Sequence, residues 1–109
     1  MNYFAHPTAV IDEKVDIGDL TNIWHFSHIM SNSKIGIGCN IGQNVVISPD
    51  VKLGNNVKIG GQAGISGHLK IGNNVEIAGG SGVIKDIPEN SKVMGYPAKN
   101  IRDFLKDNK

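Results

Sequence analysis

An aliphatic residue recurs at every sixth position from Ile11 to Val83, and this repeat constrains the fold more than any other feature of the chain. Every member of the series is Ile except Leu53 and Val83. A second series, small or apolar throughout, stands two positions before the first and runs from Ala9 to Ser81. A spacing of two places both series on one side of a short β-strand, whereas a helix needs spacings of three or four.

Turn-forming residues separate these strands. Gly often follows the aliphatic position, and Gly, Asn or Asp often follows within two further residues. Residues 54–56 and 72–74 both read GNN and lie eighteen residues apart, and residues 36–38 read GIG another eighteen earlier. Gly and Asn tolerate the positive φ of a tight turn. The unit is therefore a short strand and a turn, which buries its apolar side only when several units stack.

This pattern resembles the left-handed parallel β-helix of hexapeptide-repeat acyltransferases. The resemblance implies coils of three hexads, a triangular prism and a homotrimer. We therefore expect an all-β fold with a left-handed parallel β-helix of about four coils at residues 9–87. Residues 1–8 would form an N-terminal cap, and residues 88–109 a loop and a short C-terminal α-helix. Ile101, Phe104 and Leu105 stand at helical spacing and would cover that end of the prism.

The composition excludes several classes of partner. The formal net charge is +1 and no block of like charges occurs, so nothing indicates a nucleic-acid-binding face or a polybasic membrane patch. No apolar run approaches the roughly 20 residues that span a bilayer, and the N-terminus does not resemble a signal peptide. Cys39 is the single cysteine, which fits a reducing compartment. We expect a cytoplasmic protein without membrane insertion.

The two halves of the chain resemble different members of the acyltransferase family. Residues 6–59, with HPTAVID, NIWHFSHIM and CNIGQNVVI, resemble bacterial enzymes that N-acetylate the 3-amino group of a UDP-linked sugar with acetyl-CoA. Residues 60–106, with GGQAGISGHLKIG, SGVIKDIPEN and GYPAKNIRDFLK, resemble UDP-3-O-acylglucosamine N-acyltransferase of lipid A, and hence lipopolysaccharide, biosynthesis. That enzyme takes its acyl chain from acyl carrier protein. A natural recombinant, a shortened gene or an engineered chimera would all give this mixture.

The resemblance implies transfer of an acyl group, acetyl if the N-terminal half decides, to the amino group of a nucleotide-linked amino sugar. The donor would be acetyl-CoA or an acyl carrier protein thioester, and no metal is expected. His68 is the candidate catalytic residue, because its Gly-His pair matches a motif beside the acyl-carrier arm of the lipid A enzyme. Asp50 and Asp86 lie eighteen residues before and after it. Stacked coils would place both carboxylates beside the imidazole, and a surface ladder without chemistry is the alternative.

Residues 76–86 and 94–102 resemble the last coil and the following loop that hold CoA in this family. Small side chains there would let a pantetheine arm approach backbone amides, and basic side chains would pair with phosphates. The resemblance also places two of the residues, Pro97 and Ala98, beside the adenine. The candidate cofactor-binding residues are Ala78, Gly79, Gly80, Lys85, Pro97, Ala98, Lys99 and Arg102. The same residues would end the prism and begin the capping helix, and both roles are compatible.

His25, His28, Gln43 and Asn44 are the candidate substrate-binding residues. The two histidines belong to the WHFSH signature, whose Trp24 equally suits packing between subunits. Their spacing of three differs from the spacing of five in the zinc site of related carbonic anhydrases. Gln43 stands where the lipid A enzyme has its main catalytic histidine, and glutamine cannot act as a general base near neutral pH.

These departures keep a second hypothesis open. Besides Gln43, the chain shows no counterpart of the uridine-binding domain of the lipid A enzyme or of the later catalytic coils of the sugar acetyltransferases. A shortened or chimeric β-helix scaffold that folds and trimerises without catalysis would have these features.

Overall fold

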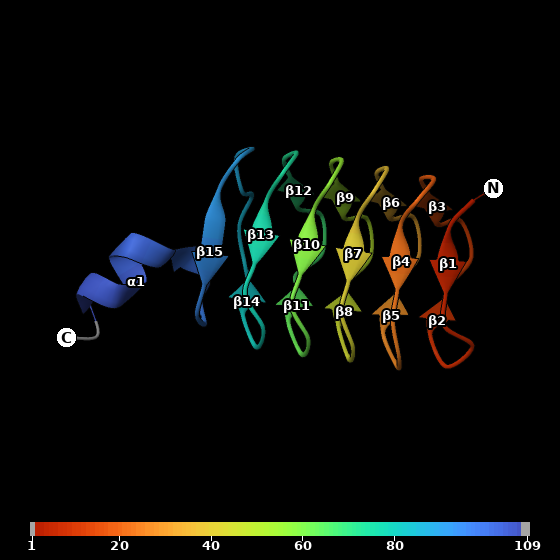
Figure 1. The fold of residues 1–109 in the computed structure, drawn as a ribbon, viewed down its shortest axis with the longest axis horizontal. Helices are drawn as coiled ribbons and strands as arrows, with labels where there is room; N and C mark the ends of the chain where they lie inside the picture. The colour runs from red at the N-terminus through yellow and green to blue at the C-terminus, as the bar shows by residue number, and fades with distance from the viewer. Residues whose placement is uncertain (1, 108–109) are drawn as a thin grey trace.

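Residues 2–107, the part of the chain that the computed structural model describes, form a β-solenoid that ends in one short helix (Figure 1). Parallel strands stack in three sheets, here named A, B and C, and each coil visits them in that order. Sheet A contains β1 (Phe4–Ala5), β4 (Asn22–Ile23), β7 (Asn40–Ile41), β10 (Lys58–Ile59), β13 (Glu76–Ile77), β15 (Lys92–Met94) and the antiparallel β16 (Lys99–Asn100). Sheet B contains β2 (Val10–Ile11), β5 (His28–Ile29), β8 (Val46–Ile47), β11 (Gly64–Ile65) and β14 (Gly82–Val83). Sheet C contains β3 (Asp16–Ile17), β6 (Lys34–Ile35), β9 (Lys52–Leu53) and β12 (Lys70–Ile71), and the helix α1 (Ile101–Asp107) follows β16.

The solenoid has about five coils rather than the predicted four. Strand β1 pairs with β4 and lies within the segment predicted as a cap at residues 1–8, because Ala5 occupies the inward position six residues before Ile11. At the other end β15 pairs with β13, so sheet A continues beyond residue 87. Met1 of the predicted cap and residues 108–109 of the predicted C-terminal segment lie outside the described residues.

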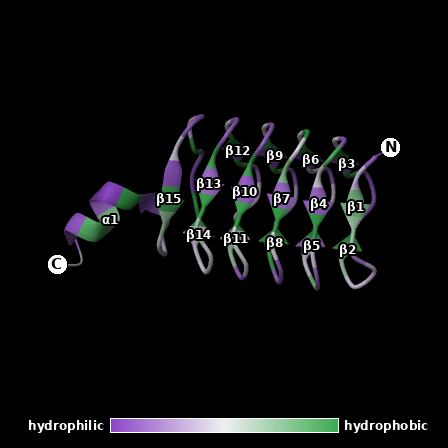
Figure 2. Cartoon of the chain, in the orientation of Figure 1, coloured by the Kyte–Doolittle hydropathy of each residue, from purple (hydrophilic) through white to green (hydrophobic). Residues whose placement is uncertain are grey.

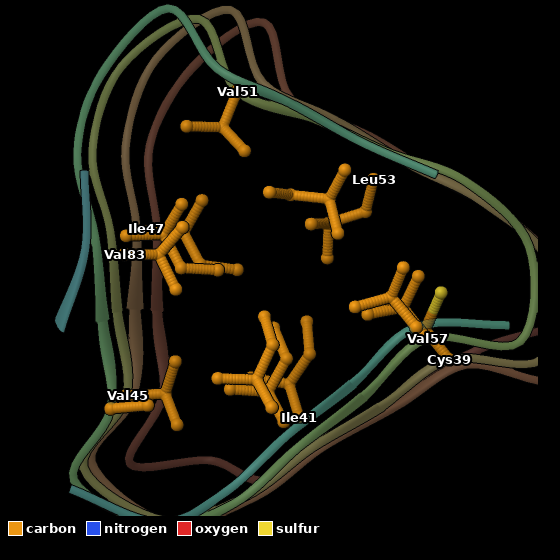
Figure 3. Close-up of a cluster of buried hydrophobic side chains, with 14 of the residues drawn as sticks. Cys39, Ile41, Val45, Ile47, Val51, Leu53, Val57 and Val83 are labelled. Carbon is orange, nitrogen blue, oxygen red and sulfur yellow. The ribbon is translucent and has the colours of Figure 1, made fainter. Parts of the chain in front are cut away.

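The two series of inward residues form the core, as the repeat predicts. In Figure 3, Val45, Val51 and Val57 occupy the corners of a triangular cross-section, and Ile41 and Ile47 point inward from its sides. All five are completely buried. The colours along β7, β10 and β13 in Figure 2 show a hydrophilic outer residue followed by an apolar inner one. Each fully buried aliphatic side chain contributes roughly 1.5–3 kcal/mol, so this ladder holds the prism together.

Hydroxyl groups complete the core of the second coil. Ser27 Oγ donates a hydrogen bond to the Gly42 carbonyl at 2.6 Å and accepts one from the Val45 N–H at 3.1 Å. Thr21 and Ser33 make the same two bonds to the coil above them. Polar inward residues are therefore compatible with complete burial, because each satisfies two backbone groups of the next coil.

The turns take up the left-handed backbone that their composition predicts. Gly38, Asn56 and Asn74 have φ values of 69°, 57° and 58°, and they occupy one corner of successive coils. Two residues before Gly38, only Gly fits at position 36, since a Cβ there would lie 2.3 Å from the Gly54 carbonyl oxygen. Three edges result, here called the A/B, B/C and C/A edges after the sheets that their turns connect.

The two ends of the prism differ. At the C-terminal end α1 packs on β15 and β16, where Ile101 and Phe104 are half-buried and Leu105 is exposed. Leu105 therefore does not take the covering role that its helical spacing predicts. At the other end Ala5 and Ile11 are only partly buried, although they pack against the core. No helix formed by residues 2–107 combines the length and the apolar character that crossing a membrane requires.

Candidate functional site

The A/B edge carries most of the predicted substrate-binding residues and the small residues predicted to bind the cofactor. Its turns stack through backbone hydrogen bonds: the His25 carbonyl accepts from Asn44 N–H at 2.9 Å, and the Gln43 carbonyl accepts from Gln62 N–H at 2.8 Å. Gly80 N–H continues this series to the coil below it at 2.9 Å. Residues that are far apart in the sequence therefore form one continuous edge.

Two adjoining hollows open on this edge. The edge hollow, of about 550 Å³, is lined by Trp24, Gly42, Gln43, Asn44, Gly61 and Gln62. The sheet-B hollow, of about 330 Å³, reaches over the outer face of sheet B from Asn44 and Gln62 to Gly80, Ser81 and Tyr96. Because Asn44 and Gln62 line both, the two hollows form one depression that crosses the edge.

The sheet-B hollow fits the narrow arm of a CoA-type donor. A Cβ built on Gly64 or Gly80 would meet no atom within 4 Å, so these glycines leave open space. Ser81 Oγ is buried and has no hydrogen-bond partner among the described residues. The Tyr96 ring packs over Gly82 at the far end of the hollow. An arm of methylene and amide groups would cover the apolar lining of this outer face, whereas the Ser81 hydroxyl belongs to the inward column of the core.

His68 and Asp50 meet at the B/C edge, on the other side of sheet B. His68 Nδ1 lies 2.9 Å from Asp50 Oδ2, and the two residues occupy equivalent corners with φ values of 65° and 60°. The hydrogen bond with His68 is the main cause that lowers the pKa of the Asp50 carboxyl, and the charges of Lys52 and Lys34 lower it further. The His68 side chain is 79% exposed, so its Nε2 faces solvent.

Asp86 does not complete the predicted Asp-His-Asp ladder. Val83 pairs with Ile65 of β11, eighteen residues earlier. Ile87, however, pairs with Ile71 of β12, only sixteen residues earlier. The turn between Val83 and Ile87 is thus two residues shorter than the turn below it. Asp86 Oδ1 consequently accepts a hydrogen bond from Lys70 N–H at 2.8 Å instead of approaching His68. The prediction of a carboxylate above His68 is wrong, and the pairing with Asp50 is confirmed.

The two histidines of the WHFSH signature do not converge. His28 lies on the outer face of sheet B, where its Nε2 is 2.9 Å from Asp12 Oδ1. The His25 ring instead stacks on His6, with ring centroids 3.6 Å apart, and its Nδ1 is buried without a hydrogen-bond partner in the described chain. Neither ring lines the two hollows of the A/B edge. Within residues 2–107, no three His, Cys, Asp or Glu side chains are grouped as a metal site requires.

Three of the predicted cofactor-binding residues lie in different environments at the C-terminal end of the prism. Ala98 is buried, and its N–H donates to the Gly82 carbonyl at 2.7 Å, so it fixes the loop against β14. Lys99 Nζ is paired with the Asp107 carboxylate of α1. The exposed Arg102 side chain has no partner among the described residues. Arg102 can therefore bind a phosphate without first breaking an ion pair, whereas Lys99 cannot.

The four remaining predicted cofactor-binding residues lie in four different places. Ala78 lines a third hollow, of about 500 Å³, on the outer face of sheet A. Gly79 lies at the A/B edge, and a Cβ there would be 3.1 Å from the backbone of the coil below. Lys85 is exposed in the shortened turn of the last coil, and Pro97 is exposed in the C-terminal loop.

Trp24, Gln62, Ser81 and Tyr96 line the depression but are not among the predicted site residues. Trp24 and Gln62 lie one coil away from Gly42 and Asn44, so the eighteen-residue register alone could have found them. Ser81 belongs to the inward series of the repeat, whereas Tyr96 carries no such signal. The position of Tyr96 depends on the chain leaving the regular coil after β15, which the repeat does not encode.

Sequence comparisons support the hexapeptide-repeat resemblance. Residues 50–85 match the family of bacterial transferase hexapeptide repeats (six repeats). A stretch of 38 residues is 47% identical to dTDP-3-amino-3,6-dideoxy-alpha-D-galactopyranose 3-N-acetyltransferase from Aneurinibacillus thermoaerophilus. This stretch covers 35% of the present chain and 19% of that enzyme.

Solved structures confirm the solenoid fold. A hexapeptide-repeat acetyltransferase from Vibrio cholerae matches with a TM-score of 0.84 at 23% identity, over 92% of this chain and 69% of its own. A variant of GDP-perosamine N-acetyltransferase from Caulobacter crescentus, in complex with CoA and GDP-perosamine, matches with a TM-score of 0.70 at 23% identity. The match covers 92% of this chain but only 56% of the perosamine enzyme. The division of the present chain into two halves of different resemblance stays a prediction.

Proposed function

We propose that this protein transfers an acyl group from a CoA-type thioester to the amino group of a nucleotide-linked sugar. When bound, the thioester supplies a carbonyl carbon that the sugar amine attacks, so that a C–N bond replaces the C–S bond and the thiol departs. The sequence match to a nucleotide-sugar N-acetyltransferase supports this reaction class. The depression at the A/B edge supports it independently, because the unbonded amide side chains of the edge hollow adjoin the narrow sheet-B hollow there.

The hydrogen bond between Asp50 and His68 is the observation on which the proposed chemistry chiefly rests. A carboxylate on Nδ1 favours the tautomer that carries its proton there, which leaves the Nε2 lone pair free. Nε2 of His68 would accept the proton that the amine loses on acylation and pass it to the departing thiolate, which leaves as the thiol. Gln43, which lines the edge hollow, would position the acceptor and cannot take the proton.

We further propose that the protein acts as a cytoplasmic homotrimer. His68 and the edge hollow lie at opposite edges of sheet B in one chain, and a neighbouring subunit that brought its own B/C edge to the A/B edge would unite them. Val10, Val46 and Ile84 are exposed on the outer side of sheet B, and their burial would favour such contacts. The lone buried Cys39 fits a reducing compartment.

Calorimetric titration with CoA, on protein whose mass in solution has been determined, tests the donor site. We expect binding by a trimer, weakened in Arg102→Ala and unchanged in Lys106→Ala, a matched loss of one exposed cation from the same helix. Binding that is equal in both variants would refute the assignment of Arg102. A mass near that of one chain would refute the trimer.

Acyl transfer to UDP-linked amino sugars, with acetyl-CoA and acyl carrier protein thioesters compared as donors, tests the catalytic role of His68. His68→Asn retains a residue that accepts positive φ, as Asn32 does at the same corner two coils earlier. It should abolish turnover and leave CoA binding unchanged. Asn32→Gly is the control and should retain full turnover. Unchanged turnover in His68→Asn would remove His68 from the mechanism.

The alternative function, a trimeric scaffold without catalysis, is favoured by two observations. Lys99 is already paired with Asp107, and Gln43 supplies an amide where a base would serve. A well-folded trimer that binds no CoA would support this alternative and overturn the proposed transferase.

A further inference from the structure

The indole of Trp24 lies beside the edge hollow and is held in one orientation. Its Nε1–H donates a hydrogen bond to Asn40 Oδ1 at 2.9 Å, and its ring contacts Phe4 with centroids 5.4 Å apart. The polar atom of the ring is therefore engaged by the protein. Its remaining surface is available to the hollow that it lines.

Backbone packing keeps that side of the indole clear of side chains. Gly42 follows Trp24 in the register of sheet A, one coil further along the prism. A Cβ on Gly42 would lie 2.9 Å from the Ile59 carbonyl oxygen, so no larger residue fits there. Gly61 adds no side chain to the lining either. The space beside the indole is thus a fixed property of the edge.

Three amide side chains around this space, those of Gln43, Asn44 and Gln62, make no hydrogen bond within the described part of the chain. The C/A edge differs, because its amides serve the structure itself. There Asn55 Oδ1 accepts from Ile37 N–H at 2.9 Å, and Asn73 Oδ1 accepts from the backbone of the next asparagine below at 2.8 Å.

The lining of the edge hollow selects for one kind of ligand. Its residues are an indole, two glycines and three amides, with no charged side chain, so it suits a neutral group rather than a phosphate. Each amide both donates and accepts hydrogen bonds, as a sugar hydroxyl does. The C–H groups on the face of a pyranose ring can pack on an aromatic surface while its hydroxyls reach the rim.

We propose that Trp24 is the stacking platform for the pyranose ring of the acceptor, and that Gln43, Asn44 and Gln62 bind the hydroxyls of that ring. This inference rests on the proposed function and names the part of the acceptor that this edge holds. The nucleotide lies outside the edge hollow.

The fluorescence of Trp24, the only tryptophan of the sequence, reports this site directly. Titration with UDP-glucosamine should change its intensity or emission maximum saturably, whereas UDP alone should produce no change. An equal response to UDP would show a nucleobase on the indole and would overturn the proposal. So would calorimetric binding of UDP-glucosamine without any change in fluorescence.

Two asparagines with the same backbone provide a matched pair of variants. Asn44 and Asn56 both have φ of 57°, and glycine already occupies the equivalent corner of another coil on each edge, at Gly80 and Gly38. Asn44→Gly should weaken binding of UDP-glucosamine about fivefold, the equivalent of one hydrogen bond. Asn56→Gly should leave it unchanged. Equal effects of the two variants would overturn the assignment.

Turnover separates this proposal from the proposed function. If UDP-glucosamine perturbs Trp24 in a protein that neither binds CoA nor transfers acyl groups, the sugar site stands and the transferase fails. If Trp24→Ala retains the KM for the acceptor in an active enzyme, the platform fails and the transferase stands. Trp24→Phe, which keeps an aromatic surface, should restore most of the acceptor affinity lost in Trp24→Ala.

Discussion

Ser27 and Ser81 occupy the same inward column of sheet B, yet their removal should have opposite consequences. Ser27 Oγ satisfies the Gly42 carbonyl and the Val45 N–H, at 2.6 and 3.1 Å, and the residue is completely buried. Ser27→Ala leaves both backbone groups without a partner. Each such loss costs about 1–3 kcal/mol. Water can reach the partly buried Gly42 carbonyl more easily than the buried Val45 N–H, so the loss at the carbonyl should be the smaller of the two. We therefore expect the unfolding free energy of Ser27→Ala to fall by about 2–4 kcal/mol in total.

Ser81→Ala is the matched control, since Ser81 Oγ is buried but has no hydrogen-bond partner among residues 2–107. Without ligand, its removal should change the unfolding free energy by less than about 0.5 kcal/mol or raise it. Ala63 stands in the same column, so alanine fits there without strain. Urea unfolding followed by far-UV circular dichroism, at one fixed protein concentration, measures both variants. Similar losses in the two would refute the argument that the hydroxyl acts through the next coil.

Four further outcomes can be checked. Gly36→Ala should lower the unfolding free energy by about 1–3 kcal/mol, because its Cβ would lie 2.3 Å from a carbonyl oxygen of the next coil. Gly64→Ala, with no atom within 4 Å, should be nearly neutral in the same urea assay. The pKa of Asp50 is lowered chiefly by its hydrogen bond with His68, so the contribution of Asp50 to stability should be present above the ordinary carboxyl pKa and lost as pH falls through the lowered pKa. NMR titration of His68→Asn should show the pKa of Asp50 rising. An unchanged pKa of Asp50 in that variant would show that His68 does not cause the shift. Burial raises the pKa of the Cys39 thiol, so a disulfide reagent should react with it only after unfolding, and rapid reaction in the native protein would be inconsistent with the core.

Much of the candidate site can be located from the sequence because a solenoid converts sequence spacing into position. Gln43 and Asn44 stack one coil above His25, as a register of eighteen predicts. The same register correctly pairs His68 with Asp50. Where the register breaks, the prediction fails.

The hexad repeat by itself determined the architecture of this protein. It specified which side chains are buried, where the corners lie and which residues share an edge, because each coil is positioned only by its neighbours. Its count of coils fell short at the two ends, where Ala5 replaced a larger aliphatic residue and where β15 continued sheet A beyond residue 87.

Only the tertiary structure decided the local chemistry. A turn shortened by two residues moved Asp86 away from His68, and the chain's departure from the last regular coil left Ser81 without a partner. The orientation of Trp24 likewise depends on its contacts with Asn40 and Phe4. These features depend on contacts made where the repeat is interrupted or where side chains lie outside the regular core. The spacing of the hexads does not encode such contacts.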